Sequence, residues 1–266
     1  MVRLGDEYVF PSPRSADKHG IVAYGGDLDP ERIIEAYKNG IFPWFESDQN
    51  LLWWSPDPRM ILYPSKIKVS KSLKSFIKKS PFKITFNSDF EEVINSCSNI
   101  KRLGQKGTWI TDGLKNSFLK LHEMGLAMSV EVWENSEIVG GLYGLDLGDV
   151  FCGESMFSKS SNSSKVALVA LSAELKKNKY KFIDCQIPTE HLKSMGGEKI
   201  SRKNARRSIV TLGRIKKGEI LTKENLIMKR PGTGISPTKL KKIIGKIAKK
   251  NLQDDYVIKF SDIKKR

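Results

Sequence analysis

The residues that decide the fold lie at 126–152 and read LAMSVEVWENSEIVGGLYGLDLGDVFC. The first eight of them (126–133) are typical of a strand, and the turn at Asn135-Ser136 leads into a second strand over 137–143. A further turn after Asp146 precedes a third strand, which begins at Val150. The three segments predict a meandering sheet.

Helical patterns flank this sheet on both sides in the sequence. After it, apolar residues recur on one stripe of a helix at about 164–177, and a short apolar strand follows at 181–185. Before it, Thr111 or Asp112 can cap a helix that ends near Gly125. Three meandering strands, a helix and a further strand predict an α+β fold.

The segments outside this unit differ from it in character. Asp29 and Pro30 suit the start of a helix that Gly40 can end, and the prolines within 41–64 predict an ordered loop region with short strands. After about Ala205, short runs of β-favouring residues at 208–212 and 219–221 predict a separate small β-rich module over 205–266, with a loop at 230–235.

The positive charge of the chain is concentrated in that module. The chain of 266 residues has a formal charge of +16, and residues 205–266 hold 18 Lys and Arg against 5 Asp and Glu, a net charge of +13. The first 204 residues therefore carry a net charge of only +3. A basic balance suggests a polyanionic partner, but charge alone does not identify the first 204 residues as a nucleic-acid enzyme.

The rest of the composition is that of a globular protein, with 39% hydrophobic and 29% charged residues. We expect no membrane span, because no stretch of about 18 uncharged apolar residues occurs. We also expect no signal peptide, because the first residues lack an apolar run. Three widely spaced cysteines argue against a disulfide framework and fit a reducing compartment, so we expect a cytoplasmic protein.

Tryptophans are the first candidates for ligand binding. Four of the five lie in or near the segments Gly40–Phe45, Leu52–Arg59 and Gly107–Ile110, and they include Trp44 and Trp109. Exposed aromatic faces can stack on nucleic-acid bases. The alternative for each ring is that it fills the hydrophobic core.

Three polar residues among apolar ones are the second group of candidates. Glu154 lies within Phe151–Ser158, where a buried carboxylate is costly unless it is paired, so it could hold a cationic substrate or satisfy an internal Arg. Asp184 ends a strand two residues before Gln186, so the alternation of a strand places both side chains on one face. These two residues could act as a unit or form a structural hydrogen bond.

Other chemistries find little support. The three histidines have no partners at zinc spacing, so we expect no metal, and the sequence has neither a Gly-rich phosphate loop nor a nucleophile elbow. Cys152 and Cys185 could be nucleophiles, but they are better interpreted as small buried apolar residues. Gly140-Gly141 inside a strand is typical of a bulge or of close approach by a ligand.

Taken together and in order, these sequence segments resemble the leucyl/phenylalanyl-tRNA–protein transferase family over about 200 of the 266 residues. Each segment alone is weak evidence, whereas the ordered set is specific. The matching segments are Phe10–Pro13, Gly25–Leu28, Gly40–Phe45, Leu52–Arg59, Ser129–Trp133, Gly140–Gly144, Gly153–Ser158, Ile183–Gln186 and Ile200–Arg202.

The resemblance implies a small N-terminal α/β domain over 1–64 and an acetyltransferase-like (GNAT) domain over 65–204 that uses neither acetyl-CoA nor another cofactor. It implies transfer of Leu, Phe or Met from aminoacyl-tRNA to acceptor proteins that begin with Arg or Lys, which marks them for degradation under the N-end rule. We expect the enzyme to be a monomer.

The resemblance also implies roles for individual residues. Trp44 and Trp109 hold the terminal adenosine of the tRNA, with Tyr37 nearby, and Glu154 meets the basic acceptor N-terminus. Asp184 and Gln186 handle the attacking α-amine. The residues implied to line the aminoacyl pocket are Leu142, Phe151, Met156, Leu168, Leu171, Leu175 and Ile183. Those implied to contact the tRNA backbone are Lys71, Lys78 and Lys79, for which a solvated helix face is the alternative.

A mechanism follows as a hypothesis. The aminoacyl ester is already activated, so the enzyme mainly holds amine and ester in attack geometry. Because Gln is not a normal base, we expect Asp184 to polarise Gln186 and Gln186 to orient the amine. The amine proton then leaves through Asp184, water or the ribose hydroxyl.

Several positions depart from the family pattern, and they put substrate range and rate in question rather than reaction type. They are Ser75 in place of a basic residue, Phe118 in place of Tyr, Met128 in place of His, and Pro188-Thr189 in place of Leu-Asn.

The C-terminal module resembles the SAF (antifreeze-like) module of N-acetylneuraminate synthases. The resemblance rests on Arg206–Val210, Ile215–Thr222 and Lys229–Ile235, and it implies that Arg206 or Arg207 matches a sugar-binding arginine. The synthase barrel is absent, so we expect an accessory module without catalysis, although its charge would suit a contact with tRNA. Two alternative functions stay open at this point: a non-catalytic adaptor that binds tRNA or protein N-termini, and a carbohydrate-binding protein.

Overall fold

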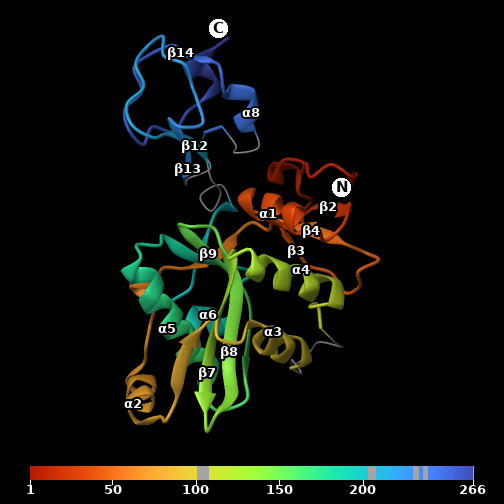
Figure 1. The fold of residues 1–266 in the computed structure, drawn as a ribbon, viewed down its shortest axis with the longest axis vertical. Helices are drawn as coiled ribbons and strands as arrows, with labels where there is room; N and C mark the ends of the chain where they lie inside the picture. Colours follow the sequence, from red (N-terminus) through yellow and green to blue (C-terminus); the bar gives the residue numbers. More distant parts are fainter. Residues whose placement is uncertain (101–107, 203–207, 230–233, 236–238, 266) are drawn as a thin grey trace.

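The computed structural model describes residues 1–100, 108–202, 208–229, 234–235 and 239–265. Figure 1 shows helices on both sides of a central sheet, with the N-terminal segment beside it and the C-terminal module beyond. Within the described residues, no helix is long and apolar enough to cross a membrane.

The N-terminal segment forms a four-stranded sheet, one α-helix and a short 3-10 helix (Pro13–Ser15). Its strand order is β1-β2-β4-β3. Helix α1 (Pro30–Lys38) begins as predicted, because the Asp29 carboxylate accepts a hydrogen bond from the backbone N–H of Glu31 and Pro30 occupies the first turn. It ends before Gly40, which has φ of 71°. The strands are β1 (Val2–Leu4), β2 (Ile21–Gly25), β3 (Phe42–Pro43) and β4 (Leu52–Trp54).

A seven-stranded sheet forms the centre of the molecule, with the order β11-β5-β10-β9-β8-β7-β6. The predicted meander is confirmed as β7, β8 and β9, which pair antiparallel. Strand β10 then pairs parallel to β9. The strands are β5 (Arg59–Leu62), β6 (Lys83–Phe86), β7 (Ala127–Glu134), β8 (Glu137–Asp146), β9 (Val150–Ser158), β10 (Phe182–Gln186) and β11 (Glu198–Ile200).

Each face of this sheet carries its own hydrophobic core. One core includes buried residues of α1, α3 and α4, and the other includes residues of α2 and α5. Figure 1 shows α3 and α5 on opposite sides of the strands. The helices are α2 (Lys71–Lys79), α3 (Phe90–Asn99), α4 (Asp112–Glu123), α5 (Ser163–Lys177) and α6 (Glu190–Ser194).

The two glycines of β8 make room for protein rather than for a ligand. A Cβ on Gly140 would lie 2.3 Å from Ser163 Oγ at the start of α5, and one on Gly141 would lie 2.7 Å from the Val130 carbonyl oxygen. The register of β7 and β8 also shifts between Val132 and Trp133, beside Gly140. The bulge interpretation is therefore confirmed, and the close approach comes from helix α5.

The C-terminal module has a hydrophobic core of its own. Strand β12 (Ser208–Thr211) was predicted, but it pairs with β13 (Leu226–Lys229), which was not. The strand expected at 219–221 is a single bridge between Ile220 and Ile247. The remaining elements are α8 (Leu240–Ile243), β14 (Ile247–Ala248), a 3-10 helix (Phe260–Asp262) and β15 (Ile263–Lys264). The chain is thus α+β with several sheets.

Candidate active site

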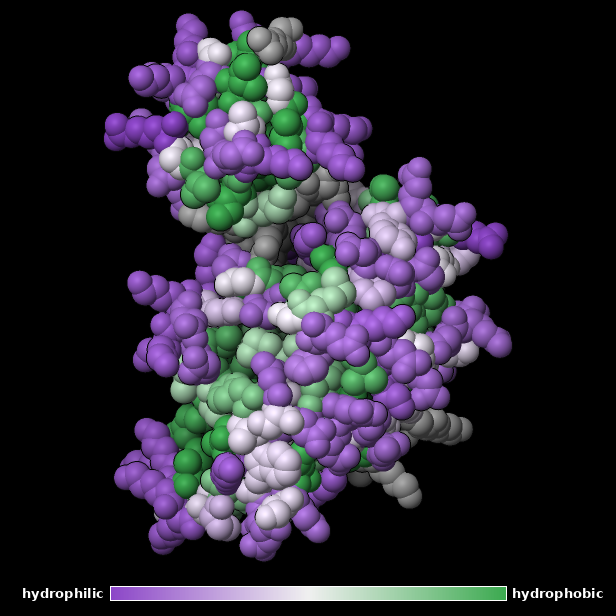
Figure 2. Space-filling model, in the orientation of Figure 1, coloured by the Kyte–Doolittle hydropathy of each residue, from purple (hydrophilic) through white to green (hydrophobic). Residues whose placement is uncertain are grey.

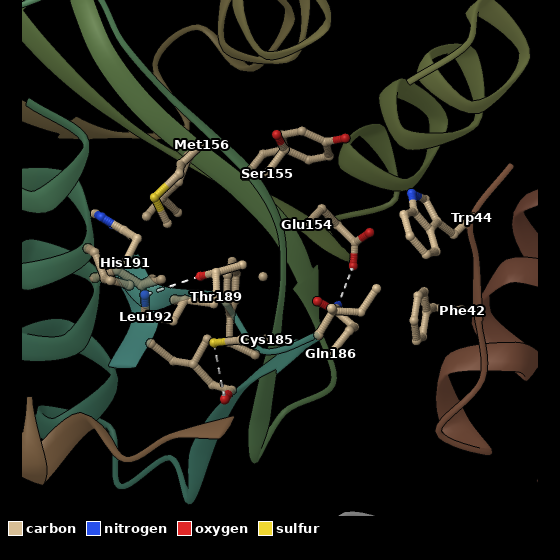
Figure 3. Close-up of a pocket in the computed structure, with 18 of the residues that line it drawn as sticks. Phe42, Trp44, Glu154, Ser155, Met156, Cys185, Gln186, Thr189, His191 and Leu192 are labelled. Carbon is tan, nitrogen blue, oxygen red and sulfur yellow. Dashed lines mark hydrogen bonds between the residues drawn. The ribbon is translucent and has the colours of Figure 1, made fainter. Parts of the chain in front are cut away.

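A pocket of about 490 Å³ lies where the N-terminal segment meets the large sheet. Its walls come from β3 and the following Trp44, from β8, β9 and β10, and from α5 and α6. Figure 3 shows two sides to it: Glu154 and Gln186 lie toward Phe42 and Trp44, whereas Met156, His191 and Leu192 gather on the other side.

The side of the pocket around Met156 is apolar and contains most of the residues predicted to surround an aminoacyl side chain. Six of the seven line the pocket, and they are Leu142, Phe151, Met156, Leu168, Leu171 and Ile183. Leu175 does not line it: it is buried one turn further along α5, in the core behind this wall.

The aromatic residues fall into two classes. Trp44 and Trp109 are partly exposed and both line the pocket, so their rings are accessible to a ligand. Trp53 is fully buried and donates its indole N–H to the Gly25 carbonyl at 2.9 Å, so the core alternative holds for that ring. Tyr37 is also buried and does not line the pocket.

Asp184 lies beneath the pocket and is held by Arg59. Arg59 donates to the Asp184 carboxylate through Nε at 2.8 Å and Nη2 at 3.1 Å, and both side chains are 2% exposed. The same guanidinium lies 4.7 Å from the centre of the Phe42 ring. A two-point Arg–carboxylate pair fixes orientation as well as charge, so Asp184 is held rigidly and does not line the pocket.

A bulge in β10 turns Gln186 into the pocket. Asp184 pairs with Ile61 and Gln186 with Met60, which leaves Cys185 without a partner on β5. Gln186 takes φ of 55°, a left-handed conformation that non-glycine residues rarely adopt. Its backbone N–H donates to Asp184 Oδ1 at 3.2 Å. Asp184 therefore accepts a hydrogen bond from the backbone of Gln186, while the side-chain amide of Gln186 donates to Glu154.

Glu154 is the acidic residue among those that line the pocket. Its Oε1 accepts a hydrogen bond from Gln186 Nε2 at 3.1 Å (Figure 3). Burial and the charge of Asp184 raise the pKa of Glu154, while Tyr37, Arg59 and Gln186 lower it, and the net result is a pKa of about 8. The carboxyl group is therefore largely protonated at pH 7 when no cation is bound.

Tyr37 completes the surroundings of Glu154. Burial and the nearby Glu154 carboxyl group raise the pKa of Tyr37 well above its usual value. No described residue forms a hydrogen bond of ordinary geometry with its hydroxyl group. Tyr37 therefore belongs with Glu154 rather than with the exposed tryptophans.

Sequence patterns missed several residues in the pocket and beneath it. Arg59 was noted only as the end of a motif, although Asp184, 125 positions away, requires a cation. His191 lines the apolar side beside Met156 (Figure 3), and its Nε2 has no partner among the described residues. Cys185 also lines the pocket, but burial raises the pKa of its thiol, so it is not a thiolate at neutral pH.

The remaining predicted positions lie away from the pocket or differ in role. Lys71, Lys78 and Lys79 are exposed on α2 and do not line it. The positions that depart from the family pattern are also spread: Phe118 is buried against the ring of the pocket residue Tyr143, Met128 packs in the core of α5, and Thr189 lines the pocket and caps α6.

Two predicted features cannot be placed. Arg206 and Arg207 lie outside the described residues, as does Gly107 at the start of the third tryptophan segment. Among the described residues, no group of three His, Cys, Asp or Glu is placed to hold a metal ion.

The geometry suits a bulky apolar group held next to a polar reaction centre. The apolar side can take an uncharged side chain, and the exposed indoles can take a flat ring. Glu154 and Gln186 lie between these two parts, where a carboxylate can attract a cation and an amide can orient an N–H group. These are the parts needed to bring an amine to an acyl group.

Comparison with protein families gives three matches along the chain. The model described as leucyl/phenylalanyl-tRNA protein transferase matches residues 61–209, and that of its N-terminal domain matches residues 26–57. The SAF domain model matches residues 206–264.

Individual relatives match the same part of the chain. Leucyl/phenylalanyl-tRNA–protein transferases of Flavobacterium johnsoniae and Christiangramia forsetii are 52% and 53% identical to it, over 76% of this chain and 95% and 96% of theirs. The protein of the same name from Shewanella baltica is 50% identical over 73% of this chain and 82% of its own.

Solved structures include an acetyltransferase among the neighbours. A ribosomal-protein-alanine N-acetyltransferase from Brucella melitensis biovar Abortus is 12% identical, with a TM-score of 0.32 over 43% of this chain and 85% of its own.

Proposed function

The chain belongs to the leucyl/phenylalanyl-tRNA protein transferase family and is an aminoacyltransferase, and from this premise we propose that its pocket performs the transfer. The substrates are Leu-, Phe- or Met-tRNA and proteins that begin with Arg or Lys, which the added residue marks for degradation under the N-end rule. One observation carries the proposal: a single pocket joins an apolar wall, two accessible tryptophans and the Glu154–Gln186 pair.

The apolar side of the pocket holds the aminoacyl side chain. Leu168, Leu171 and Ile183 form a wall that lacks charged groups, which suits Leu, Phe and Met and discriminates weakly among apolar shapes. Leu175 supports this wall from behind. The accessible rings of Trp44 and Trp109 hold the terminal adenine, because aromatic stacking is tolerant of base identity.

Glu154 binds the acceptor. Because its pKa is high, the Glu154 carboxyl group is largely neutral when no acceptor is bound. A guanidinium or ammonium group brought beside it favours the charged form. Gln186 positions the carboxylate through its hydrogen bond, and the Tyr37 hydroxyl lies near it. An acceptor whose first side chain is neutral or acidic gains nothing from this charge, which accounts for selection of Arg and Lys.

The reaction exchanges an ester for an amide. The acceptor amine nitrogen attacks the carbonyl carbon, a C–N bond forms, and the C–O bond to the ribose breaks. The amine loses one proton and the released ribose oxygen gains one, directly or through water. Gln186 donates to Glu154 through Nε2, so its amide oxygen is available to accept an N–H of the amine and aim its lone pair.

Asp184 is a positioning residue in this scheme. Its carboxylate is buried, and it accepts two hydrogen bonds from Arg59 and one from the backbone N–H of Gln186. It therefore does not reach the amine. This replaces the route in which the proton leaves through Asp184. Arg59, Asp184 and the bulge together fix the direction of the Gln186 side chain.

We propose the same three-part division of the chain with one change. Strand β5 precedes residue 65 but pairs in the large sheet, so the first boundary lies before Arg59 rather than at 64. The other two units are the remainder up to 204 and the module at 205–266. A pocket built within one chain is consistent with a monomer, and a substrate made of aminoacyl-tRNA is consistent with a cytoplasmic enzyme.

The test is transfer of label. The purified chain is incubated with radiolabelled Leu-tRNA and either a peptide that begins with Arg or the same peptide beginning with Asp. We expect label on the Arg peptide alone. Label on neither peptide, with tRNA still bound, would favour the non-catalytic adaptor, and label on both would remove the role of Glu154.

A further inference from the structure

The C-terminal module carries a large positive charge that contributes nothing to its apolar core. Its interior is a closed apolar cluster that includes Ile209, Leu221, Ile243 and Ile258, each 8% exposed or less. Its net charge of +13 lies on 62 residues and opposes compaction by self-repulsion. Figure 2 shows hydrophilic side chains projecting from the face of the module in view.

Backbone hydrogen bonds bring several of these lysines together. The turn at Lys216-Lys217 lies against Lys249, because Lys217 N–H donates to Asn251 Oδ1 at 2.8 Å and Gly218 N–H donates to the Ala248 carbonyl at 2.9 Å. Lys264 joins them, since β15 pairs it with Ile247. We call Lys216, Lys217, Lys249 and Lys264 the basic ridge, and all four side chains are exposed.

Three acidic residues of the module accept backbone hydrogen bonds in turns, and one of them, Glu219, does so beside the ridge. Glu219 accepts the backbone N–H of Lys216 at 2.8 Å, Asp254 accepts that of Gly213 at 2.7 Å, and Asp262 accepts that of Lys259 at 2.9 Å. Asp262 also pairs with Lys250, which is therefore left out of the ridge. The carboxylates thus stabilise turns, and the ridge keeps a surplus of positive charge for an external anion.

We propose that the basic ridge binds the phosphate backbone of the aminoacyl-tRNA whose 3′ end occupies the transferase pocket. This inference rests on the proposed function. Exposed lysines on neighbouring backbone segments suit the phosphates of a nucleic acid, which lysine binds as a point charge without reading sequence. The transferase part of the chain carries a net charge of only +3, so the module supplies most of the attraction for a polyanion.

The test replaces three ridge lysines in the full chain, as Lys216→Gln, Lys217→Gln and Lys249→Gln together. The matched control replaces three exposed lysines at and just after the end of α5, as Lys176→Gln, Lys177→Gln and Lys179→Gln. With Leu-tRNA we expect the ridge variant to raise the KM for tRNA about tenfold and to lower the salt dependence of log KM by about one for each lysine that contacts phosphate.

A second substrate separates this proposal from the proposed function. Leucyl-adenosine keeps the ester and the base but has no phosphate, so the ridge variant should use it as well as the wild type does. An unchanged KM for tRNA, or the same loss in the control variant, would overturn the role of the ridge. A change confined to the KM for the acceptor would assign the ridge to acidic proteins instead. If the wild type transferred leucine from neither substrate, the proposed function itself would be wrong.

Discussion

Glu154 is the residue whose protonation links acceptor binding to pH. Its pKa is raised to about 8, so the neutral form dominates below that pH and the carboxylate above it. A cationic acceptor prefers the carboxylate, and the KM for an Arg peptide should therefore fall as pH rises toward about 8. Steady-state kinetics from pH 6 to 9 measures this dependence.

Glu154→Gln is the matching variant. It keeps the shape and can still meet Gln186, but it removes the charge, so the KM for the Arg peptide should rise roughly tenfold or more. The KM for Leu-tRNA should stay the same. Because the acceptor amine titrates equally in both enzymes, the ratio of their KM values isolates Glu154, and a ratio independent of pH would contradict its assignment.

Asp184 should matter for stability as well as for rate. Asp184→Asn leaves the buried Arg59 without its charge partner, which costs about 3–5 kcal/mol. Replacing both partners by apolar residues, as in Asp184→Leu with Arg59→Met, should restore much of the stability but not the activity, since the hydrogen bond from the Gln186 backbone N–H to Asp184 is then lost. Urea unfolding and single-turnover transfer measure the two effects, and full activity in the double variant would refute the positioning role.

At the scale of the elements, α5 packs closely on β8 because β8 has glycine at position 140, where the two meet. Gly140→Ala would place a Cβ 2.3 Å from Ser163 Oγ, a contact that requires the start of α5 to move. We expect a loss of about 1–3 kcal/mol and weaker transfer, because α5 carries Leu168 and Leu171. Gly5→Ala, where a Cβ meets nothing within 4 Å, is the control and should be neutral.

The elements could be predicted where their signals are local. Asp29 and Thr111 cap helices α1 and α4 as expected, and the turn at Asn135-Ser136 separates β7 from β8. The bulge in β10 was not predicted, because it depends on register against β5 across 125 positions of sequence. The same separation hid the pairing of Arg59 with Asp184, and hence the way in which Gln186 is aimed.

The site was predicted less evenly than the fold. The pocket residues came from resemblance to a family, and the structure gathers most of them around one cavity. Composition and periodicity alone did not indicate His191, whose place in the wall depends on how α6 folds back after the bulge. Tyr37 shows what the sequence could not predict. It lies near Trp44 in the sequence, but in the structure it is buried beside Glu154.

For the whole molecule, separate cores imply separate unfolding. The core of the C-terminal module shares no residue with the two cores of the large sheet. Ile258→Ala removes a fully buried side chain from the module and should destabilise it by about 2–5 kcal/mol. Calorimetry should show two transitions, of which only the one that belongs to the module shifts.

The activity of that variant provides the accompanying check. Transfer from leucyl-adenosine should be unaffected by Ile258→Ala at temperatures where the large sheet is folded. A single transition that moves as a whole, with loss of transfer from leucyl-adenosine, would mean that the module and the transferase fold as one unit.

The most direct test of the central claim is a crystal structure with an amide-linked phenylalanyl-adenosine, which cannot be cleaved as the ester is. We expect the phenyl ring against Leu168, Leu171 and Ile183, the adenine against Trp44 or Trp109, and the amide carbonyl near Gln186. An analogue bound elsewhere, or bound with its phenyl ring beside Glu154, would contradict the assignment of this pocket to aminoacyl transfer.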